Sequence, residues 1–201
     1  MSVREERSVE RGSVPAAARL GAAEGPVRSS AVSADPDRRP AEPTRVLFVC
    51  WGNICRSPTA EAVMRRAVER AGLEGLVEID SAGTSAEHTG DGPDRRAIAE
   101  ADRRGLDLRP QRARRVRPDD WERFDLLLVA DATVERALLR SAPHGAARAK
   151  VHRMTAFGPD ADLGEVPDPY YGGPDGFADV YDLLERACEG LIDHLRAPGA
   201  A

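Results

Sequence analysis

The chain has 201 residues and a formal net charge of −5, so its size suits one domain and its charge does not favour binding to nucleic acid. No apolar run is long enough to span a membrane, and the N-terminus lacks the apolar core of a signal peptide. Three cysteines are too few for a secreted disulfide scaffold, and we therefore expect a protein of the reducing cytoplasm.

The first 43 residues differ in composition from the rest of the chain. They mix Arg, Glu, Ser, Ala and Pro with almost no large apolar residue, and they show no helical or strand periodicity. Such a segment cannot bury enough apolar surface to offset the entropy lost on ordering. A genuine extension and an upstream start codon would both produce it. We predict a disordered tail at 1–43, a domain at 44–197 and a short C-terminal tail at 198–201.

From residue 45 onward, strand and helix patterns alternate. The segments expected to form strands are 45–49, 76–79, 124–129 and 149–154. The segments expected to form helices are 58–71, 93–104, 133–139 and 177–195. Residues 157–176 are rich in proline and glycine and are expected to form a long loop. This alternation predicts an α/β fold with a four-stranded parallel sheet between two layers of helices, and with ligands bound beyond the strand C-termini.

A short polar loop joins the first expected strand to the first expected helix. Gly52 and Asn53 lie in the turn, Ser57 suits the N-cap, and Pro58 suits the first helical position, where no N–H is needed. A loop that enters a helix in this way directs several backbone N–H groups at one point, and the helix dipole adds to their field. The pattern therefore predicts a phosphate-binding loop directly after the first strand.

Two side chains give this loop its chemistry. Cys50 lies at the base of the loop, where its thiolate would be favoured, and Arg56 can bind an oxyanion with two parallel hydrogen bonds. Together they suit an in-line attack on a phosphate ester. The alternatives are a buried strand-end cysteine beside a surface arginine, and half of a metal site formed with Cys55. No second cysteine pair or histidine cluster completes such a site, so we expect no metal.

A phosphatase also needs a proton donor for the leaving group. Asp168 lies between two prolines in the long loop before the last helix, and Tyr170 and Tyr171 follow it, where they could flank an aromatic leaving group. By itself this segment would be an ordinary turn.

The string Val-Cys-Trp-Gly-Asn-Ile-Cys-Arg-Ser-Pro at 49–58 resembles the signature of the low-molecular-weight protein tyrosine phosphatases. The Asp-Pro pair at 168–169 is similar to the general acid motif of that family, and the resemblance covers roughly residues 45–196. It implies hydrolysis of phosphotyrosine and aryl phosphates through a cysteinyl-phosphate, without a cofactor. The implied partners are phosphotyrosine-containing proteins, with inorganic phosphate as product.

The resemblance implies a role for each matching residue. It makes Cys50 the nucleophile, Arg56 the phosphate ligand and Asp168 the general acid and then the base. Ser57 should hydrogen-bond the thiolate, and Asn53, helped by Ser81, should hold the loop in a strained conformation. The residues expected to contact substrate are Trp51, Gly52, Asn53, Ile54, Cys55, Ser57, Tyr170 and Tyr171.

Four positions need a separate interpretation. Asp131 matches an aspartate of the family, but we interpret it as the N-cap of the third helix. Glu87 precedes His88 where the family usually has tryptophan or a similar aromatic residue, and Gln111 replaces a family histidine. Trp51 is larger than the residue that many relatives have after the nucleophile. We interpret the basic run at 109–117 as solvated surface.

Three other functions fit parts of the pattern. An arsenate reductase on the same fold needs two further cysteines close together, and only Cys188 remains, on an expected buried helix face. Protein arginine phosphatases of the family tend to have threonine at the position of Ile54. A module that binds phosphotyrosine without turnover would not need the nucleophile and the acid together. We also expect a reversible disulfide between Cys50 and Cys55 under oxidative stress.

Overall fold

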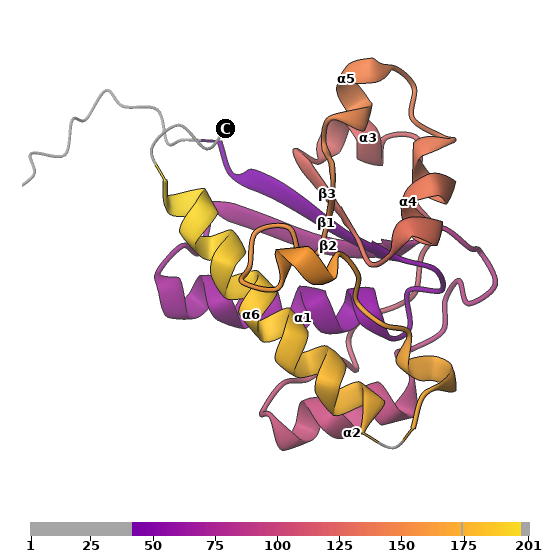
Figure 1. The fold of residues 1–201 in the computed structure, drawn as a ribbon, viewed down its shortest axis with the longest axis vertical. Coiled ribbons are helices and arrows are strands. Elements are labelled where there is room, and N and C mark those ends of the chain that lie inside the picture. The colour runs from indigo at the N-terminus through magenta and orange to yellow at the C-terminus, as the bar shows by residue number, and fades with distance from the viewer. Residues whose placement is uncertain (1–41, 174, 198–201) are drawn as a thin grey trace, which may run out of the picture. The chain divides into compact units, whose positions relative to one another are not determined.

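The computed structural model describes residues 42–173 and 175–197, and these residues form a parallel sheet between two layers of helices (Figure 1). The strands are β1 (Thr44–Cys50), β2 (Val77–Gly83), β3 (Leu126–Val129) and β4 (Val151–Arg153). Their order in the sheet is β2-β1-β3-β4, and every neighbouring pair is parallel. This confirms the predicted three-layer α/β/α fold with a phosphate-binding loop after the first strand.

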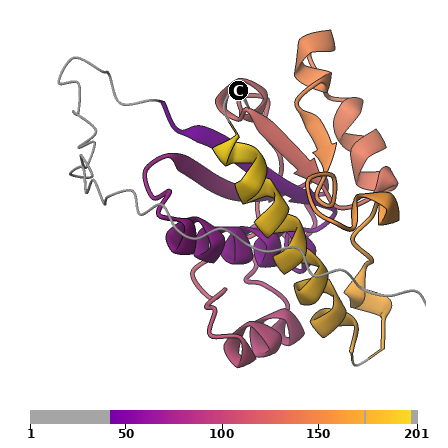
Figure 2. The ribbon, with the colours of Figure 1, turned by 60° about the vertical axis from the view of Figure 1, so that its left-hand side comes forward.

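The helices divide between the two faces of the sheet. On one face lie α1 (Arg56–Ala71) and α6 (Gly176–Arg196), with α2 (Arg95–Arg103) packed beside α6 (Figure 2). The other face is covered by α3 (Asp120–Arg123), α4 (Ala132–Leu139) and α5 (Gly145–Arg148). The four-residue helices α3 and α5 were not predicted because they are too short to show a helical period.

The central strand β1 is buried on both faces, as expected in a covered parallel sheet. Val46 and Phe48 pack into the core under α1 and α6, whereas Leu47 and Val49 pack into the core under α3 and α4. From β1 the chain continues to β2 on one side and later to β3 on the other. Cys50 ends β1, so it lies at the switch point of the sheet, where such folds bind ligands.

The predicted start of the first helix was wrong. Helix α1 begins at Arg56, and its N-cap position is Cys55, which makes no side-chain cap. Ser57 therefore lies inside the first turn, where its buried hydroxyl contacts the Cys50 sulfur instead of capping the helix. Pro58 remains in the first turn, where the backbone N–H groups have no partner in the helix. Ser57 therefore contacts the Cys50 sulfur and does not cap α1.

Other element boundaries differ for identifiable reasons. Strand β2 continues through Gly83, four residues beyond the expected end at Ile79, because it pairs along the whole length of β1. The expected third strand at 124–129 begins later, at Leu126, since Phe124 ends α3. The long loop at 157–176 contains two 3₁₀ turns, η1 (Ala161–Leu163) and η2 (Pro169–Tyr171).

Most of the predicted tails lie outside the described residues. Residues 1–41 and 198–201 are among these, and Glu42 and Pro43 precede β1 without regular structure. In the described part of the chain, no helix is long and apolar enough to cross a membrane.

Candidate active site

The loop between β1 and α1 turns tightly and is held by the end of β2. Asn53 has a φ of 56°, in the left-handed region that asparagine tolerates better than most residues. A Cβ added at Gly83 would lie 2.6 Å from the carbonyl oxygen of Trp51 and 3.2 Å from the Asn53 nitrogen. The Thr84 N–H donates to the carbonyl oxygen of Cys50 at 3.0 Å. Gly83, which the sequence did not single out, is therefore required for the loop to approach β2.

The sulfur of Cys50 is almost completely buried and receives polar contacts from the loop that follows it. The backbone N–H of Asn53 donates to Cys50 Sγ at 3.2 Å, and Ser57 Oγ lies 3.0 Å from the same sulfur. An N–H and a hydroxyl thus converge on the sulfur, and such donors can stabilise negative charge there. The expected contact between Ser57 and Cys50 is present.

Asn53 connects the loop to its surroundings through its side chain. Its Nδ2 donates to Ser57 Oγ and to Ser81 Oγ, each at 2.9 Å, and its Oδ1 accepts the Arg114 backbone N–H at 2.9 Å. Every polar atom of the amide is therefore used. These bonds offset the cost of the left-handed backbone, as expected for a strained residue at a functional site. The predicted support of Asn53 by Ser81 is present.

A second layer of charged groups holds this network in place. Ser81 Oγ donates at 2.7 Å to Oε2 of the buried Glu61, which orients the serine as an acceptor for Asn53. The Arg114 guanidinium contacts Asp80 and the buried Asp120, each at 2.8 Å. Sequence reasoning gave neither Glu61 nor Arg114 a role. Nothing distinguishes Glu61 from an ordinary helix residue, whereas Arg114 ends the run at 109–114 that is similar to a family pattern and could have been found from it.

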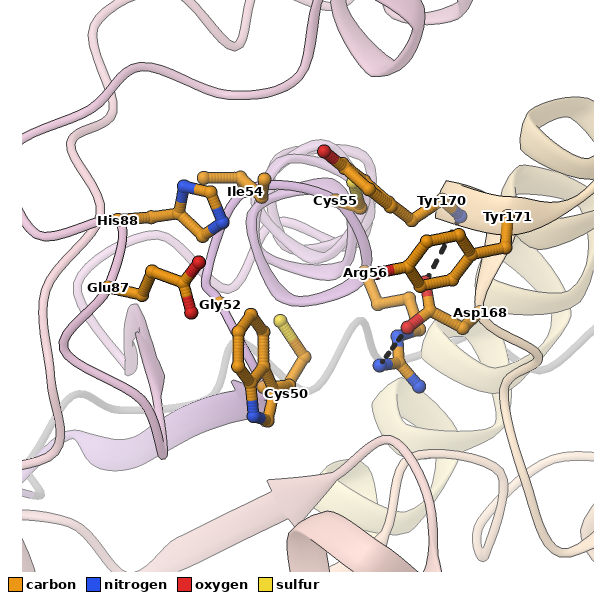
Figure 3. Close-up of a pocket in the computed structure, with 11 residues that line it drawn as sticks. Cys50, Gly52, Ile54, Cys55, Arg56, Glu87, His88, Asp168, Tyr170 and Tyr171 are labelled. Atoms are coloured by element: carbon orange, nitrogen blue, oxygen red, sulfur yellow. Dashed lines mark hydrogen bonds and ion pairs between the residues drawn. The ribbon is translucent and has the colours of Figure 1, made fainter.

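Arg56 is buried and held by two carboxylates, of which Figure 3 shows that of Asp168. Its Nη1 contacts Asp131 Oδ2 at 2.5 Å and the Val166 carbonyl oxygen at 3.3 Å, and its Nη2 contacts Asp168 Oδ2 at 3.0 Å. Within the described residues, Nε and the second hydrogen of Nη2 have no acceptor. A guanidinium has five N–H donors, so one edge is left to bind an oxyanion with two parallel bonds.

Asp131 does more than cap a helix. Its Oδ1 accepts the Val134 N–H at 2.8 Å, so the predicted N-cap is confirmed, although α4 begins one residue earlier, at Ala132. The interpretation was nevertheless incomplete, since Oδ2 pairs with Arg56. Burial opposes ionisation, but the Val134 N–H and the guanidinium outweigh it and hold the pKa of Asp131 below its usual value. Asp131 therefore remains an anionic anchor for Arg56.

Asp168 lies at the rim, where it can reach both the pocket and water. Its side chain is 44% exposed, and its Oδ1 accepts the Tyr170 N–H at 3.1 Å, which begins the turn η2. The prolines on either side restrict the backbone around it. Tyr170 and Tyr171 pack edge to face, with ring centroids 4.9 Å apart.

These groups surround one pocket of about 130 Å³. The loop after β1 contributes six lining residues: Cys50, Trp51, Gly52, Ile54, Cys55 and Arg56. Glu87, His88, Asp168, Tyr170 and Tyr171 complete the wall. Most of the residues expected to contact substrate are thus brought together. Asn53 and Ser57 do not line the pocket, and they lie behind its wall, next to the sulfur.

The other two cysteines are buried thiols. Burial, followed by the negative charge of Asp94, raises the pKa of Cys55 far above its usual value. Cys188 packs into the core from α6, as expected, and burial raises its pKa in the same way. At neutral pH both therefore remain thiols, whereas the thiolate is the reactive form of cysteine.

The departures from the family pattern have different consequences. His88 packs beside Trp51, with ring centroids 6.1 Å apart, and both side chains line the pocket. Gln111 donates to the Pro58 carbonyl oxygen at 3.1 Å. The basic run at 109–117 is not simply solvated surface, because the half-buried Arg114 supports the Asn53 network.

Comparison with known proteins identifies this arrangement. Residues 45–200 match the family model of the low molecular weight phosphotyrosine protein phosphatases. The chain is 47% identical over 154 residues to a low molecular weight protein-tyrosine-phosphatase of Streptomyces coelicolor, covering 76% of this chain and 93% of that protein. It is 36% identical over 149 residues to the human low molecular weight phosphotyrosine protein phosphatase, covering 74% and 93%.

Solved structures agree with these matches. A protein tyrosine phosphatase from Entamoeba histolytica superposes with a TM-score of 0.72 at 40% identity, over 76% of this chain and 96% of that one. YfkJ from Bacillus subtilis superposes with a TM-score of 0.70 at 37% identity, over 75% and 93%. With a cysteine-bearing loop after β1, a buried arginine and a rim aspartate around one pocket, the chain belongs to the low-molecular-weight phosphotyrosine protein phosphatase family.

Proposed function

We propose that Cys50, Arg56 and Asp168 carry out the hydrolysis of phosphotyrosine that membership of this family assigns to the chain. The observation that carries the proposal is the convergence of the Asn53 N–H and the Ser57 hydroxyl on Cys50 Sγ, in the same pocket as Arg56 and Asp168. The substrates would be phosphotyrosine-containing proteins, and the products a tyrosine side chain and inorganic phosphate. The thiol chemistry suits a reducing compartment such as the cytoplasm.

The first step would transfer the phosphoryl group to the enzyme. The Cys50 thiolate attacks phosphorus, the S–P bond forms, and the bond from phosphorus to the phenolic oxygen breaks. Asp168 gives its proton to that oxygen, so the leaving group departs as a neutral phenol. The free edge of Arg56 and the backbone N–H groups of the loop would hold the phosphoryl oxygens as charge develops on them.

The second step would release phosphate and restore the enzyme. Asp168, now a carboxylate, takes a proton from a water molecule as that water attacks phosphorus. The P–S bond breaks, inorganic phosphate forms, and the electron pair returns to the Cys50 sulfur. The contact at 3.0 Å between Ser57 Oγ and Cys50 Sγ would stabilise the departing thiolate.

The substrate class is tested by comparing three reactions of the purified chain. We expect rapid release of phosphate from a phosphotyrosine peptide, little from a matched phosphoarginine peptide, and no thiol-dependent reduction of arsenate. The third cysteine, Cys188, is in the core, away from the pocket lining, so a cysteine relay is not available. Faster cleavage of phosphoarginine, or reduction of arsenate, would contradict the proposed substrate class.

Trp51 is expected to bind the aromatic ring of the substrate together with Tyr170 or Tyr171. Its side chain is half-exposed on the pocket wall. Stacked aromatic pairs contribute about 0.5–1.5 kcal/mol beyond burial, so Trp51→Ala should raise KM for aryl phosphates roughly several-fold. The Ki of inorganic phosphate, which has no ring, should scarcely change. If both constants rise together, Trp51 only supports the loop through its packing with His88.

Cys55 is expected to protect Cys50 from irreversible oxidation. Peroxide would convert Cys50 to a sulfenic acid, which a Cys55 thiolate could capture as a disulfide that dithiothreitol reverses. Because the pKa of Cys55 is raised by burial, its thiolate is scarce at neutral pH, and protection should strengthen as the pH rises. In Cys55→Ser, activity should remain, but inactivation should become irreversible. Equal recovery of the variant and the wild type after dithiothreitol would exclude this disulfide.

A further inference from the structure

Glu87 places a carboxylate on the wall of a pocket whose substrate is an anion. The residue is exposed in the loop after β2, and it lines the same pocket as Cys50 and Arg56. In Figure 3, Glu87 and His88 lie on one side of Cys50, and Asp168 lies on the other. A carboxylate at this point repels a phosphate group. Glu87 therefore lowers affinity for phosphorylated ligands unless the ligand itself supplies a positive charge nearby.

No cation of the chain neutralises this carboxylate within the described residues. In the part of the chain that the structure describes, Glu87 makes one hydrogen bond, from its backbone N–H to Ser85 Oγ at 3.1 Å. His88, its neighbour on the wall, has its Nδ1 3.1 Å from Asp91 Oδ2. Arg56 is already paired with two aspartates. The carboxylate of Glu87 is thus available to a group outside the protein.

The loop that carries Glu87 is held by a hydrogen bond and by ring packing to the loop between β1 and α1. The Ser85 N–H donates to the Trp51 carbonyl oxygen at 2.9 Å, and the His88 and Trp51 rings pack together. A Cβ added at Gly52 would lie 2.9 Å from His88 Cδ2, which shows how closely the two loops approach. The backbone at Glu87 is consequently held at a defined place relative to Cys50, as a specificity-determining group requires.

Resting on the proposed function, we propose that Glu87 selects substrates with a lysine or arginine next to the phosphotyrosine. A phosphotyrosine that enters the pocket leaves its flanking side chains at the rim. The exposed carboxylate of Glu87 can pair there with a cation at little desolvation cost. The same carboxylate repels an acidic neighbour. Attraction of a basic neighbour and repulsion of an acidic one both increase the difference in affinity between the two kinds of substrate, and this difference defines the specificity.

The test uses phosphotyrosine peptides that differ only at the residue before or after the phosphotyrosine, which is lysine, glutamine or glutamate. The measured quantity is the ratio of kcat/KM for the lysine and glutamate peptides within each enzyme, so a general change in activity cancels. The enzymes are the wild type, Glu87→Gln and Glu87→Lys. The matched control is Glu74→Gln, which removes the same charge from an exposed residue before the opposite end of β2.

We expect the wild type to prefer the lysine peptide at one flanking position by about two- to fivefold at low salt, the range of an exposed ion pair. Added salt should weaken this preference. Glu87→Gln should bring the ratio close to one, Glu87→Lys should reverse it, and Glu74→Gln should keep the wild-type value.

Three results would overturn the inference. The ratio could be the same in the wild type and Glu87→Gln, or it could fall equally in Glu74→Gln, which would indicate an effect of overall charge. The wild type could also prefer a phosphoarginine peptide, and this preference could be lost in Glu87→Gln. That result would mean that Glu87 pairs with the guanidinium of the leaving group and not with a flanking side chain. Failure of the proposed function would give a different result from failure of this inference, because the wild type would then cleave none of the phosphotyrosine peptides.

Discussion

Replacing Cys50 by serine is expected to reduce hydrolysis of p-nitrophenyl phosphate to less than about 1% of wild type, since loss of a covalent nucleophile costs several orders of magnitude. Binding of phosphate or vanadate should partly survive, because the contacts of Arg56 and its free edge do not involve the sulfur. Steady-state kinetics and calorimetric titration with vanadate measure the two quantities separately.

Cys188→Ala is the matched control for the loss of a thiol. Cys188 is in the core below α1, where its sulfur lies 3.9 Å from the Ala60 carbonyl oxygen. Removing it should lower the melting temperature, because a small cavity forms, and leave kcat almost unchanged. A melting temperature for Cys50→Ser close to that of the wild type shows that the variant is folded. Turnover above about 1% in that folded variant would reject Cys50 as the nucleophile.

Asp168→Asn is expected to lower kcat by about 10²- to 10⁴-fold for substrates with poor leaving groups, the range for loss of general acid catalysis. The loss should be smaller for good leaving groups, which need little protonation. Asparagine keeps an oxygen that can accept the Tyr170 N–H, so the turn should be preserved. The measurement is kcat for a series of aryl phosphates with leaving groups of increasing basicity, followed by a pH profile.

Asp131→Asn separates acid catalysis from support of Arg56. Both aspartates contact this guanidinium, but Asp131 does not line the pocket. The Asp131→Asn substitution should weaken phosphate binding and lower kcat by a similar factor for every leaving group. Because the pKa of Asp131 is lowered, its carboxylate stays ionised and keeps its stabilising charge as the pH falls through the usual range of an aspartate, and the charge is lost only below that range. An equal loss across leaving groups in Asp168→Asn would show that another group supplies the proton.

The fold and the loop between β1 and α1 could be predicted because their determinants are local in sequence. A buried strand, a short loop and a helix follow one another directly, so the separation of Cys50 and Arg56 already places them in one loop. Asp168 could be predicted from its motif. The start of α1 was mispredicted because a capping preference and a functional contact compete for Ser57, and the contact prevails.

The support of these groups could not be predicted, because it depends on residues far apart in the chain. Asp131 and the Val166 carbonyl oxygen meet Arg56 only once β3 and the long loop are in place. Glu61 acts on Asn53 through Ser81, and Arg114 contacts Asn53 directly, from a helix and a loop that the sequence alone does not bring together. Buried charges of this kind depend on having a partner, and partners are a property of the fold.

The most direct test of the proposed mechanism is to trap the phosphorylated enzyme. Asp168→Asn should slow the attack of water more than transfer from a good leaving group, so the intermediate should accumulate during turnover of p-nitrophenyl phosphate. Rapid quenching, digestion and mass spectrometry would then locate the phosphoryl group. The proposed mechanism predicts one phosphoryl group on the sulfur of Cys50. A phosphoryl group on another residue, or turnover without any phosphorylated peptide, would contradict it.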